Sequence, residues 1–93
     1  MKIDLQNKNI LVTGASRGIG AAIAKELGTS GARVAIHYNK EKETAEDVAQ
    51  SSGNGSKIFN ANLQDPANCE MLFKDVLEEF GHLDAIINNA GAA

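Results

Sequence analysis

The sequence is poor in cysteine, proline and aromatic residues. It contains one cysteine, one proline, one tyrosine, three phenylalanines and no tryptophan. The lone Cys69 excludes a disulfide within the chain and is typical of a reducing compartment. No apolar run approaches the roughly 20 residues that a membrane-spanning helix needs, and the first residues lack the apolar core of a signal peptide. We therefore expect a cytoplasmic protein without a membrane partner.

The sequence also lacks a large excess of either positive or negative charge. Lysine and arginine number 9, and aspartate and glutamate 12, which gives a net charge of −3. Such a balance lacks the basic footprint of nucleic-acid-binding proteins, so nucleic acid is not an expected partner. With 93 residues, of which 43% are hydrophobic and 23% charged, the chain has the composition and length of one small globular domain.

Short apolar runs alternate with amphipathic stretches from one end of the chain to the other. The pattern predicts strands at residues 9–13, 33–37, 57–61 and 84–87, and helices at residues 17–29, 42–51 and 65–80. Residues 51–56 are expected to form a loop because they consist of Ser, Gly and Asn. Alternating strands and helices indicate an α/β fold in which right-handed crossovers join parallel strands. We expect a Rossmann-type sheet of order 3-2-1-4, flanked by helices, with a crevice between the first and fourth strands.

Two of the predicted helices carry a recognisable apolar face. In the first helix, Ile19, Ile23 and Leu27 recur at helical spacing, and Ala22 and Ala24 allow close approach to the sheet. The third helix starts with a capping acid followed by proline and ends at a glycine. Its expected buried stripe consists of Cys69, Leu72, Phe73, Val76 and Phe80.

The most informative segment is T-G-A-S-R-G-I-G at residues 13–20. It follows the apolar residues 10–12 and opens the first predicted helix. Glycines between a buried strand and a helix allow the backbone to approach phosphates, and the helix N-terminus offers free N–H groups and a partial positive charge. The spacing therefore predicts a site for the pyrophosphate of a dinucleotide.

A second motif, N-N-A-G at residues 88–91, follows the fourth apolar strand. Together the two motifs resemble the classical short-chain dehydrogenase/reductase family, whose cofactor signature has the same two parts. The resemblance runs from the residues that precede the first strand to Gly91. Within the family, A-S-R-G-I-G followed by N-x-N at residues 60–62 looks most like the 3-oxoacyl-[acyl-carrier-protein] reductases.

The predicted cofactor site lies beyond the carboxyl ends of the strands, where the turns of a parallel sheet converge. Its residues are Gly14, Ala15, Ser16, Arg17, Gly18, Ile19, Gly20, Asn39, Asn62, Leu63, Asn89, Ala90 and Gly91. The alternative is that these are ordinary turns, which favour Gly and Asn in any case.

The resemblance assigns roles to two asparagines of the set and to the neighbouring Asn88. It implies that Asn62 and Leu63 reach the adenine, although many relatives have Asp at the position of Asn62, and a merely capping Asn is the alternative. It places Asn89 near the nicotinamide ribose and gives Asn88 a structural role in tying strands together. His37 and His82 have no partners at metal-ligand spacing, so we expect no metal site and interpret both as solvated or capping histidines.

The segment after the second strand predicts the choice of cofactor. NAD-specific sites place an acid there for the ribose 2′-OH, whereas residues 37–40 contain none before Glu41. A 2′-phosphate would meet no repelling carboxylate, and Arg17 in the loop offers a bidentate partner. The prediction is NADP(H); the alternative for Arg17 is a solvated surface residue.

Residues 38–42 spell Y-x-x-x-K, the catalytic signature of the family. In the family this pair follows N-N-A-G, whereas Tyr38 precedes it by fifty positions and lies at the adenosine end. We interpret the match as accidental and predict no catalytic residue in the chain. The family's catalytic Ser, Tyr, Lys and Asn would all lie beyond Ala93.

Residues 1–93 are therefore predicted to be the N-terminal part of an NADP(H)-binding Rossmann domain whose remainder lies outside this chain. The resemblance implies that the parent transfers hydride between NADP(H) and a carbonyl or alcohol carbon, with a 3-oxoacyl thioester as first choice of substrate. It also implies a homo-oligomeric parent, most simply a tetramer. The alternative is a complete, non-enzymatic dinucleotide-binding or sensor module.

Overall fold

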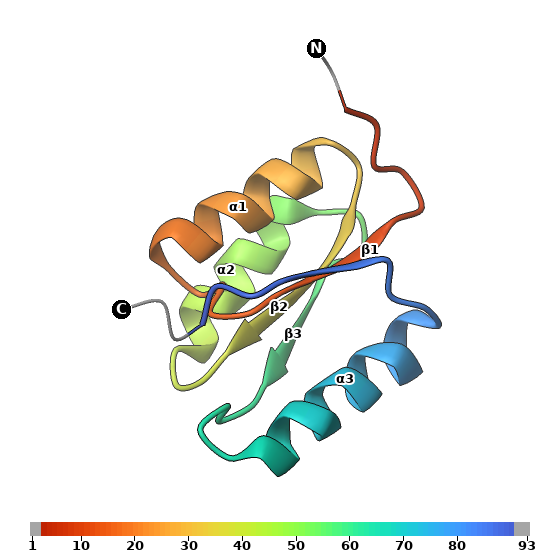
Figure 1. The fold of residues 1–93 in the computed structure, drawn as a ribbon. Helices are drawn as coiled ribbons and strands as arrows, with labels where there is room; N and C mark the ends of the chain where they lie inside the picture. Colours follow the sequence, from red (N-terminus) through yellow and green to blue (C-terminus); the bar gives the residue numbers. More distant parts are fainter. Residues whose placement is uncertain (1–2, 91–93) are drawn as a thin grey trace.

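The computed structural model describes residues 3–90, which form a four-stranded parallel sheet with helices on both faces (Figure 1). The strands are β1 (Asn9–Val12), β2 (Arg33–Tyr38), β3 (Lys57–Asn60) and β4 (Ala85–Ile87). The helices are α1 (Gly18–Thr29), α2 (Lys42–Ser52) and α3 (Pro66–Phe80). The strand order β3-β2-β1-β4 confirms the predicted sheet. The order places β1 between β2 and β4, and every pair is parallel, so the carboxyl ends of all four strands lie at one edge of the sheet.

Successive residues of the central strands enter two different cores. Ile10 and Val12 of β1 pack in the cluster that α1 and α2 cover, whereas Leu11 packs in the cluster that α3 covers. Leu11 and Val12 are both fully buried, although they are consecutive. A parallel strand covered on both faces has this continuous apolar run, because neither of its faces meets water.

Helix α1 packs through its smallest residues, and this differs from the predicted face. Gly20, Ala21, Ala24 and Gly28 are its buried residues. Ile19 is 73% exposed and Ala22 is exposed, so both were placed on the wrong face, while Ile23 and Leu27 pack at the edge of the core. Small side chains let the helix axis approach the sheet closely, and this close approach turns the bulky Ile19 toward solvent.

Helix α3 has the predicted ends and most of the predicted face. The Asp65 side chain accepts the N–H of Ala67 at 3.0 Å, Pro66 is the first helical residue, and Gly81 ends the helix with φ of 87°. Leu72, Val76 and Phe80 are buried. The expected stripe was too wide, because Phe73 is 38% exposed and Cys69 only half-buried.

The ends of the strands and helices differ from the predictions by at most one residue. Tyr38 is the last residue of β2 and is buried against α1 and α2. Helix α2 includes Ser51, as predicted, and also Ser52, whose hydroxyl donates to the Val48 carbonyl at 2.8 Å. A serine that bonds back to the preceding turn is compatible with a last helical turn, which composition alone does not reveal.

Among residues 3–90, β4 is an edge strand of the sheet, and Ile86 is 46% exposed there. None of the helices in this part of the chain is long and apolar enough to cross a lipid bilayer.

Candidate functional site

The turns that follow β1, β2, β3 and β4 surround two cavities at the carboxyl-end edge of the sheet. One cavity, of about 390 Å³, is lined by Gly14, Ser16, Arg17, His37, Asn39, Lys40, Glu41 and Ala90. The other, of about 300 Å³, is lined by His37, Asn39, Ala61, Asn62, Leu63, Gln64 and Ala90. The two cavities share His37 and Asn39, at the end of β2 and in the turn after it, and Ala90, in the turn after β4, so these turns meet at one edge of the sheet.

The glycine-rich loop, residues 13–20, folds tightly onto itself. Gly14 has φ of 61°, in the left-handed region that side chains disfavour. A Cβ on Gly20 would overlap the carbonyl oxygen of Gly14 and lie 2.6 Å from the Asn89 side-chain nitrogen. The start of α1 therefore lies directly against the first turn of the loop, and only glycine fits at position 20.

Helix α1 begins without a side-chain cap. Arg17, its N-cap residue, is extended, and its side chain makes no capping hydrogen bond. The N–H of Ala21 donates to the Arg17 carbonyl at 3.3 Å, so the amides of residues 18–20 precede this first helical bond. Free N–H groups and the positive end of the helix dipole face the loop, and this arrangement suits an anionic ligand.

Thr13 fastens the turn after β4 to the glycine-rich loop. Its hydroxyl oxygen accepts the N–H groups of Asn89 and Ala90, both at 2.9 Å, and donates to the side-chain oxygen of Asn88 at 3.1 Å. The side-chain N–H of Asn89 donates to the Gly14 carbonyl at 3.1 Å. Asn88 therefore ties the ends of β1 and β4 together, and Asn89 holds the loop itself.

His37 is buried, with 3% of its surface exposed, so of the two predicted alternatives, a solvated or a capping histidine, the solvated one is wrong for it. Its Nδ1 accepts the N–H of Gly14 at 2.9 Å, and its Nε2 donates to the carbonyl of Ala61 at 2.8 Å. An amide N–H only donates and a carbonyl only accepts, so the two contacts fix the neutral tautomer with its proton on Nε2. Burial lowers the pKa of the ring, outweighing the opposite effect of the hydrogen bond to Ala61.

Glu41 reaches back to the glycine-rich loop, which the sequence interpretation did not foresee. Its Oε2 lies 3.3 Å from Arg17 Nε and accepts from the Ser16 hydroxyl at 3.5 Å. A ligand at this turn therefore does meet a carboxylate. The Arg17 side chain is 78% exposed and that of Glu41 38%, so water screens the pair and it contributes little.

The adenosine end of the predicted site is held by asparagines. The Asn60 side chain donates to the carbonyl of Asn39 at 2.6 Å and fixes the turn after β2. The Asn62 side-chain oxygen accepts the N–H of Gln64 at 3.1 Å, a turn-capping contact of the kind considered as the alternative for this residue. Asn62 is exposed, so it lies at the surface of the cavity that it lines.

Seven predicted residues line the two cavities: Gly14, Ser16, Arg17, Asn39, Asn62, Leu63 and Ala90. Ala15 is instead fully buried beneath the loop, and the Ile19 side chain is largely exposed. Gly91 lies outside the described residues. Among residues 3–90, no group of three or more His, Cys, Asp or Glu side chains is placed to hold a metal ion.

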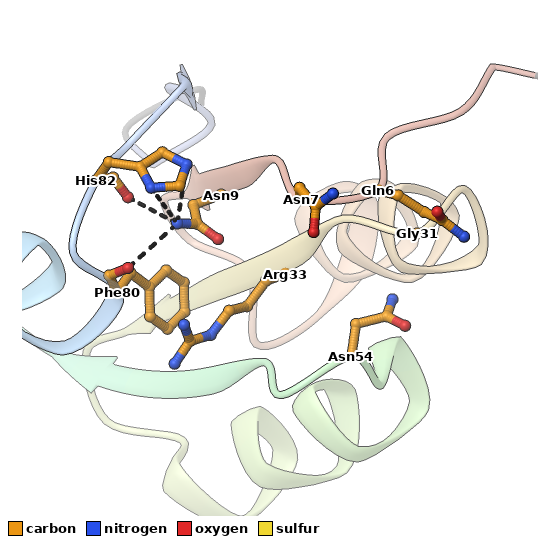
Figure 2. Close-up of a pocket in the computed structure, with 8 residues that line it drawn as sticks. All are labelled: Gln6, Asn7, Asn9, Gly31, Arg33, Asn54, Phe80 and His82. Carbon is orange, nitrogen blue, oxygen red and sulfur yellow. Dashed lines mark hydrogen bonds between the residues drawn. The ribbon is translucent and has the colours of Figure 1, made fainter.

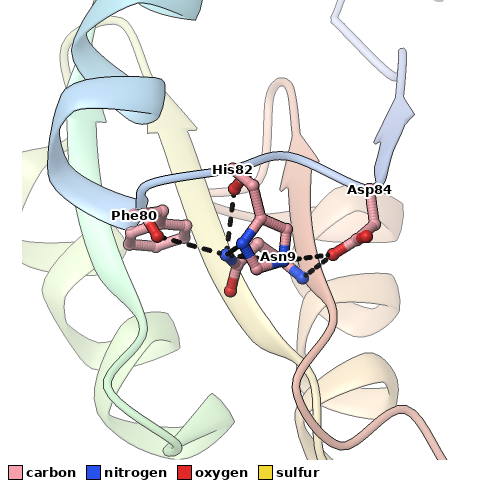
Figure 3. Close-up of polar contacts among 4 residues, drawn as sticks. All are labelled: Asn9, Phe80, His82 and Asp84. Carbon is pink, nitrogen blue, oxygen red and sulfur yellow. Dashed lines mark hydrogen bonds and ion pairs between the residues drawn. The ribbon is translucent and has the colours of Figure 1, made fainter.

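A further cavity, of about 400 Å³, lies at the opposite, amino-end edge of the sheet (Figure 2). Its one arginine, Arg33, stacks on the Phe80 ring at 4.0 Å from the ring centroid and donates to the Gly55 carbonyl at 3.3 Å. Another lining residue, Asn9, donates its side-chain N–H to the carbonyl of His82 at 2.9 Å (Figure 3). These groups already have partners within the fold, so the polar lining of this cavity has a structural explanation.

Comparisons with known proteins agree with the fold. The short chain dehydrogenase family matches residues 8–93. The 3-oxoacyl-[acyl-carrier-protein] reductase FabG of Staphylococcus aureus is 44% identical over 87 residues, which cover 90% of this chain and 35% of the relative.

Two solved structures superimpose closely. One is a dehydrogenase/reductase from Sinorhizobium meliloti, with a TM-score of 0.89 and 39% identity over 97% of this chain and 37% of that one. The other is the angucycline C-6 ketoreductase LanV with bound NADP, with a TM-score of 0.81 and 42% identity over 97% of this chain and 38% of that one. The chain thus spans about a third of the length of the relatives it matches. On these matches and this geometry, the chain belongs to the short-chain dehydrogenase/reductase family.

Proposed function

We propose that residues 1–93 are the cofactor-binding half of a reductase that transfers hydride between NADP(H) and a carbonyl or alcohol carbon. One observation carries the proposal: the uncapped N-terminus of α1 opens at the glycine-rich loop, beside two adjoining cavities lined by the predicted residues. The nicotinamide cofactor, when bound, supplies the hydride chemistry, and the protein supplies binding and orientation.

Each part of the edge suits one part of a dinucleotide. The amides at the start of α1 are donors for the pyrophosphate, because they precede the first helical hydrogen bond. Asn39 and Asn62 line the cavity beyond β2 and β3, which we assign to the adenosine. Asn89 and Ala90 follow β4 and are assigned to the nicotinamide ribose.

The preference for NADP(H) depends on an exchange at Arg17. An exposed ion pair such as Arg17–Glu41 contributes about 0–1 kcal/mol, whereas a charged hydrogen bond to phosphate contributes about 1.5–3 kcal/mol. A 2′-phosphate therefore displaces the Glu41 carboxylate from Arg17. The NADP in the similar LanV structure supports this choice.

The substrate that we propose first is a 3-oxoacyl thioester, and small ketones, sugars and steroids come after it. This order follows the S. aureus relative, whose name states that activity. We further propose that the parent is a cytoplasmic homotetramer. We assign no catalytic role to Tyr38, because it is 8% exposed and packs in the core against α1 and α2.

The test starts from the natural full-length protein, whose intact mass is measured first. We expect a chain about three times as long as this one, with NADPH oxidation that depends on a 3-oxoacyl thioester, and no turnover by residues 1–93 alone. A natural product that ends at residue 93 and binds a dinucleotide without turnover would replace the proposal by the non-enzymatic module. Turnover by residues 1–93 would contradict our assignment of the catalytic residues to the part of the parent protein outside this chain.

A further inference from the structure

His37 connects the two halves of the candidate site. It lines both cavities at the carboxyl-end edge, that of the glycine-rich loop and that of the turn after β3. Its ring forms a bridge between them, because Nδ1 accepts from the Gly14 amide and Nε2 donates to the Ala61 carbonyl. The residue after Ala61 is Asn62, so the bridge ends next to the proposed adenosine contact.

The same residue holds two consecutive amides of the loop. The carbonyl of His37 accepts the N–H of Ala15 at 2.9 Å, while its ring accepts that of Gly14 at 2.9 Å. Because the amides of Gly14 and Ala15 both donate to His37, the N–H groups that remain for an anion are those after Ala15, toward the start of α1. His37 thus selects which amides of the loop face a ligand.

The side chain is confined by its surroundings. The strand alternates, so that Ile36 and Tyr38 enter the core under α1 and α2, and Ala35 enters the other core. His37 lies on the same side as Ala35, beyond the end of the apolar cluster under α3. It is 3% exposed, and its two hydrogen bonds leave the ring a single orientation.

We propose that His37 is a positioning residue of the cofactor site, which sets the spacing between the glycine-rich loop and the turn after β3. The inference rests on the proposed binding of NADP(H). A dinucleotide contacts both turns at once, so its affinity depends on the distance between them. A ligand that contacted only one turn would not be affected by that distance. The loop would lose this spacing without the bridge, even where the sheet stays folded.

The test compares three replacements in the natural full-length protein, by titration with NADPH. His37→Leu removes both hydrogen bonds, and we expect the Kd to rise about tenfold, as for one net hydrogen bond. His37→Asn keeps an acceptor for Gly14 near the position of Nδ1 but loses the contact with Ala61, so the bridge is broken and we expect a similar rise in Kd. His37→Gln places its amide near the position of Nε2, so it serves Ala61 but not Gly14, and its Kd for NADPH should rise as well.

Ser56→Ala is the matched control. The Ser56 hydroxyl also bridges two backbone groups next to β2, accepting from Val34 at 2.9 Å and donating to Gly53 at 2.6 Å, but at the opposite end of the sheet. It should lower the free energy of unfolding and leave the Kd for NADPH unchanged. A purely structural role for His37 predicts the same result for His37→Leu.

Amide hydrogen exchange gives a readout that needs no cofactor. We expect the Gly14 amide to exchange faster in His37→Leu and His37→Gln than in His37→Asn or wild type. A wild-type Kd in any of the three His37 replacements, or an equal loss of affinity in Ser56→Ala, would overturn the inference. Failure of wild-type protein to bind NADPH or NADH would instead remove the proposed function, and the positioning role with it.

Discussion

The two ends of β1 are both fastened by side chains, but they are fastened to different effect. At the amino end, the Asn9 side chain donates to the carbonyls of Phe80 and His82, and its backbone N–H donates to Asp84 at 2.7 Å (Figure 3). Asp84 also pairs with His82 at 2.9 Å, and the hydrogen bond from Asn9 is the main cause of its lowered pKa. These contacts close the turn between α3 and β4.

At the carboxyl end, the side-chain contacts join neighbouring turns to one another and leave the start of α1 open. Thr13 and His37 engage the amides of residues 14, 15, 89 and 90, yet α1 begins without a cap beside two cavities. At the amino end, the hydrogen bonds pair polar groups within the fold. At the carboxyl end, they orient the turns, and the N–H groups at the start of α1 remain available to a ligand. Stability and binding should therefore separate between the two ends.

The largest effect is expected from Asn9→Leu at the amino end. Asn9 is 5% exposed, and its replacement leaves the carbonyls of Phe80 and His82 without their donor. We expect a loss of about 2–4 kcal/mol in the free energy of unfolding, measured with urea, and an unchanged Kd for NADPH. Gln6→Leu, an exposed position in the same cavity, should change stability by less than about 0.5 kcal/mol. Weakened NADPH binding in folded Asn9→Leu protein would break the separation.

Arg17→Ala should act at the carboxyl end alone. We expect NADPH binding to weaken by about 1.5–3 kcal/mol and NADH binding to stay nearly unchanged, because only NADPH carries the 2′-phosphate. Lys25→Ala, on the exposed side of α1, removes the same charge away from the loop and is the control. Calorimetric titration with both cofactors measures the effect. Equal losses for NADPH and NADH would refute the specificity that we assign to Arg17.

Gly20→Ala tests the close approach of α1 to the loop. Its Cβ would overlap the Gly14 carbonyl oxygen, so we expect a cost of about 1–3 kcal/mol, as for overpacking. Because the strain falls on the loop, both NADPH and NADH should bind more weakly, unlike in Arg17→Ala. A matched variant is Gly53→Ala, where a Cβ meets no atom within 4 Å, although φ of 67° adds some strain. Wild-type affinity in Gly20→Ala would show that the loop does not hold the cofactor.

Tyr38→Phe should have the smallest effect. Tyr38 packs in the core at the end of β2, so the change should leave turnover of the natural full-length enzyme within a few-fold of wild type. Loss of a true general acid or base costs about 10²–10⁴ in rate. Steady-state assays with NADPH decide between the two, and a fall of that size in kcat with unchanged KM for cofactor would make Tyr38 catalytic.

Much of the fold was predictable because local signals agree with it. The ends of α3 were predictable from Asp65-Pro66 and Gly81, and the strands from their apolar runs. The order of the strands in the sheet then followed from right-handed crossovers. The exposure of Ile19 was not predictable from spacing, because the packing distance of α1 is set by Gly20, Ala24 and their neighbours in three dimensions.

The place of the candidate site, at one edge of the sheet, was predictable from the sequence, but the contacts within the site were not. Motif positions indicate which turns converge, whereas the bridge from His37 to Gly14 and the return of Glu41 to Arg17 join residues more than twenty positions apart. One signal for His37 was present: it lies inside the run R-V-A-I-H-Y, where a polar residue in a buried strand needs partners. No comparable signal marks Glu41.

The most direct test of the account follows backbone amide resonances of the natural full-length protein as NADPH is added. We expect the amide resonances at the carboxyl-end edge to shift saturably, namely those of Gly14, Arg17, Gly20, Asn39 and Asn62. We expect unchanged positions for Asn9, Arg33 and His82 at the amino-end cavity. Saturable shifts at the amino-end cavity, with the resonances of the glycine-rich loop unmoved, would contradict the account.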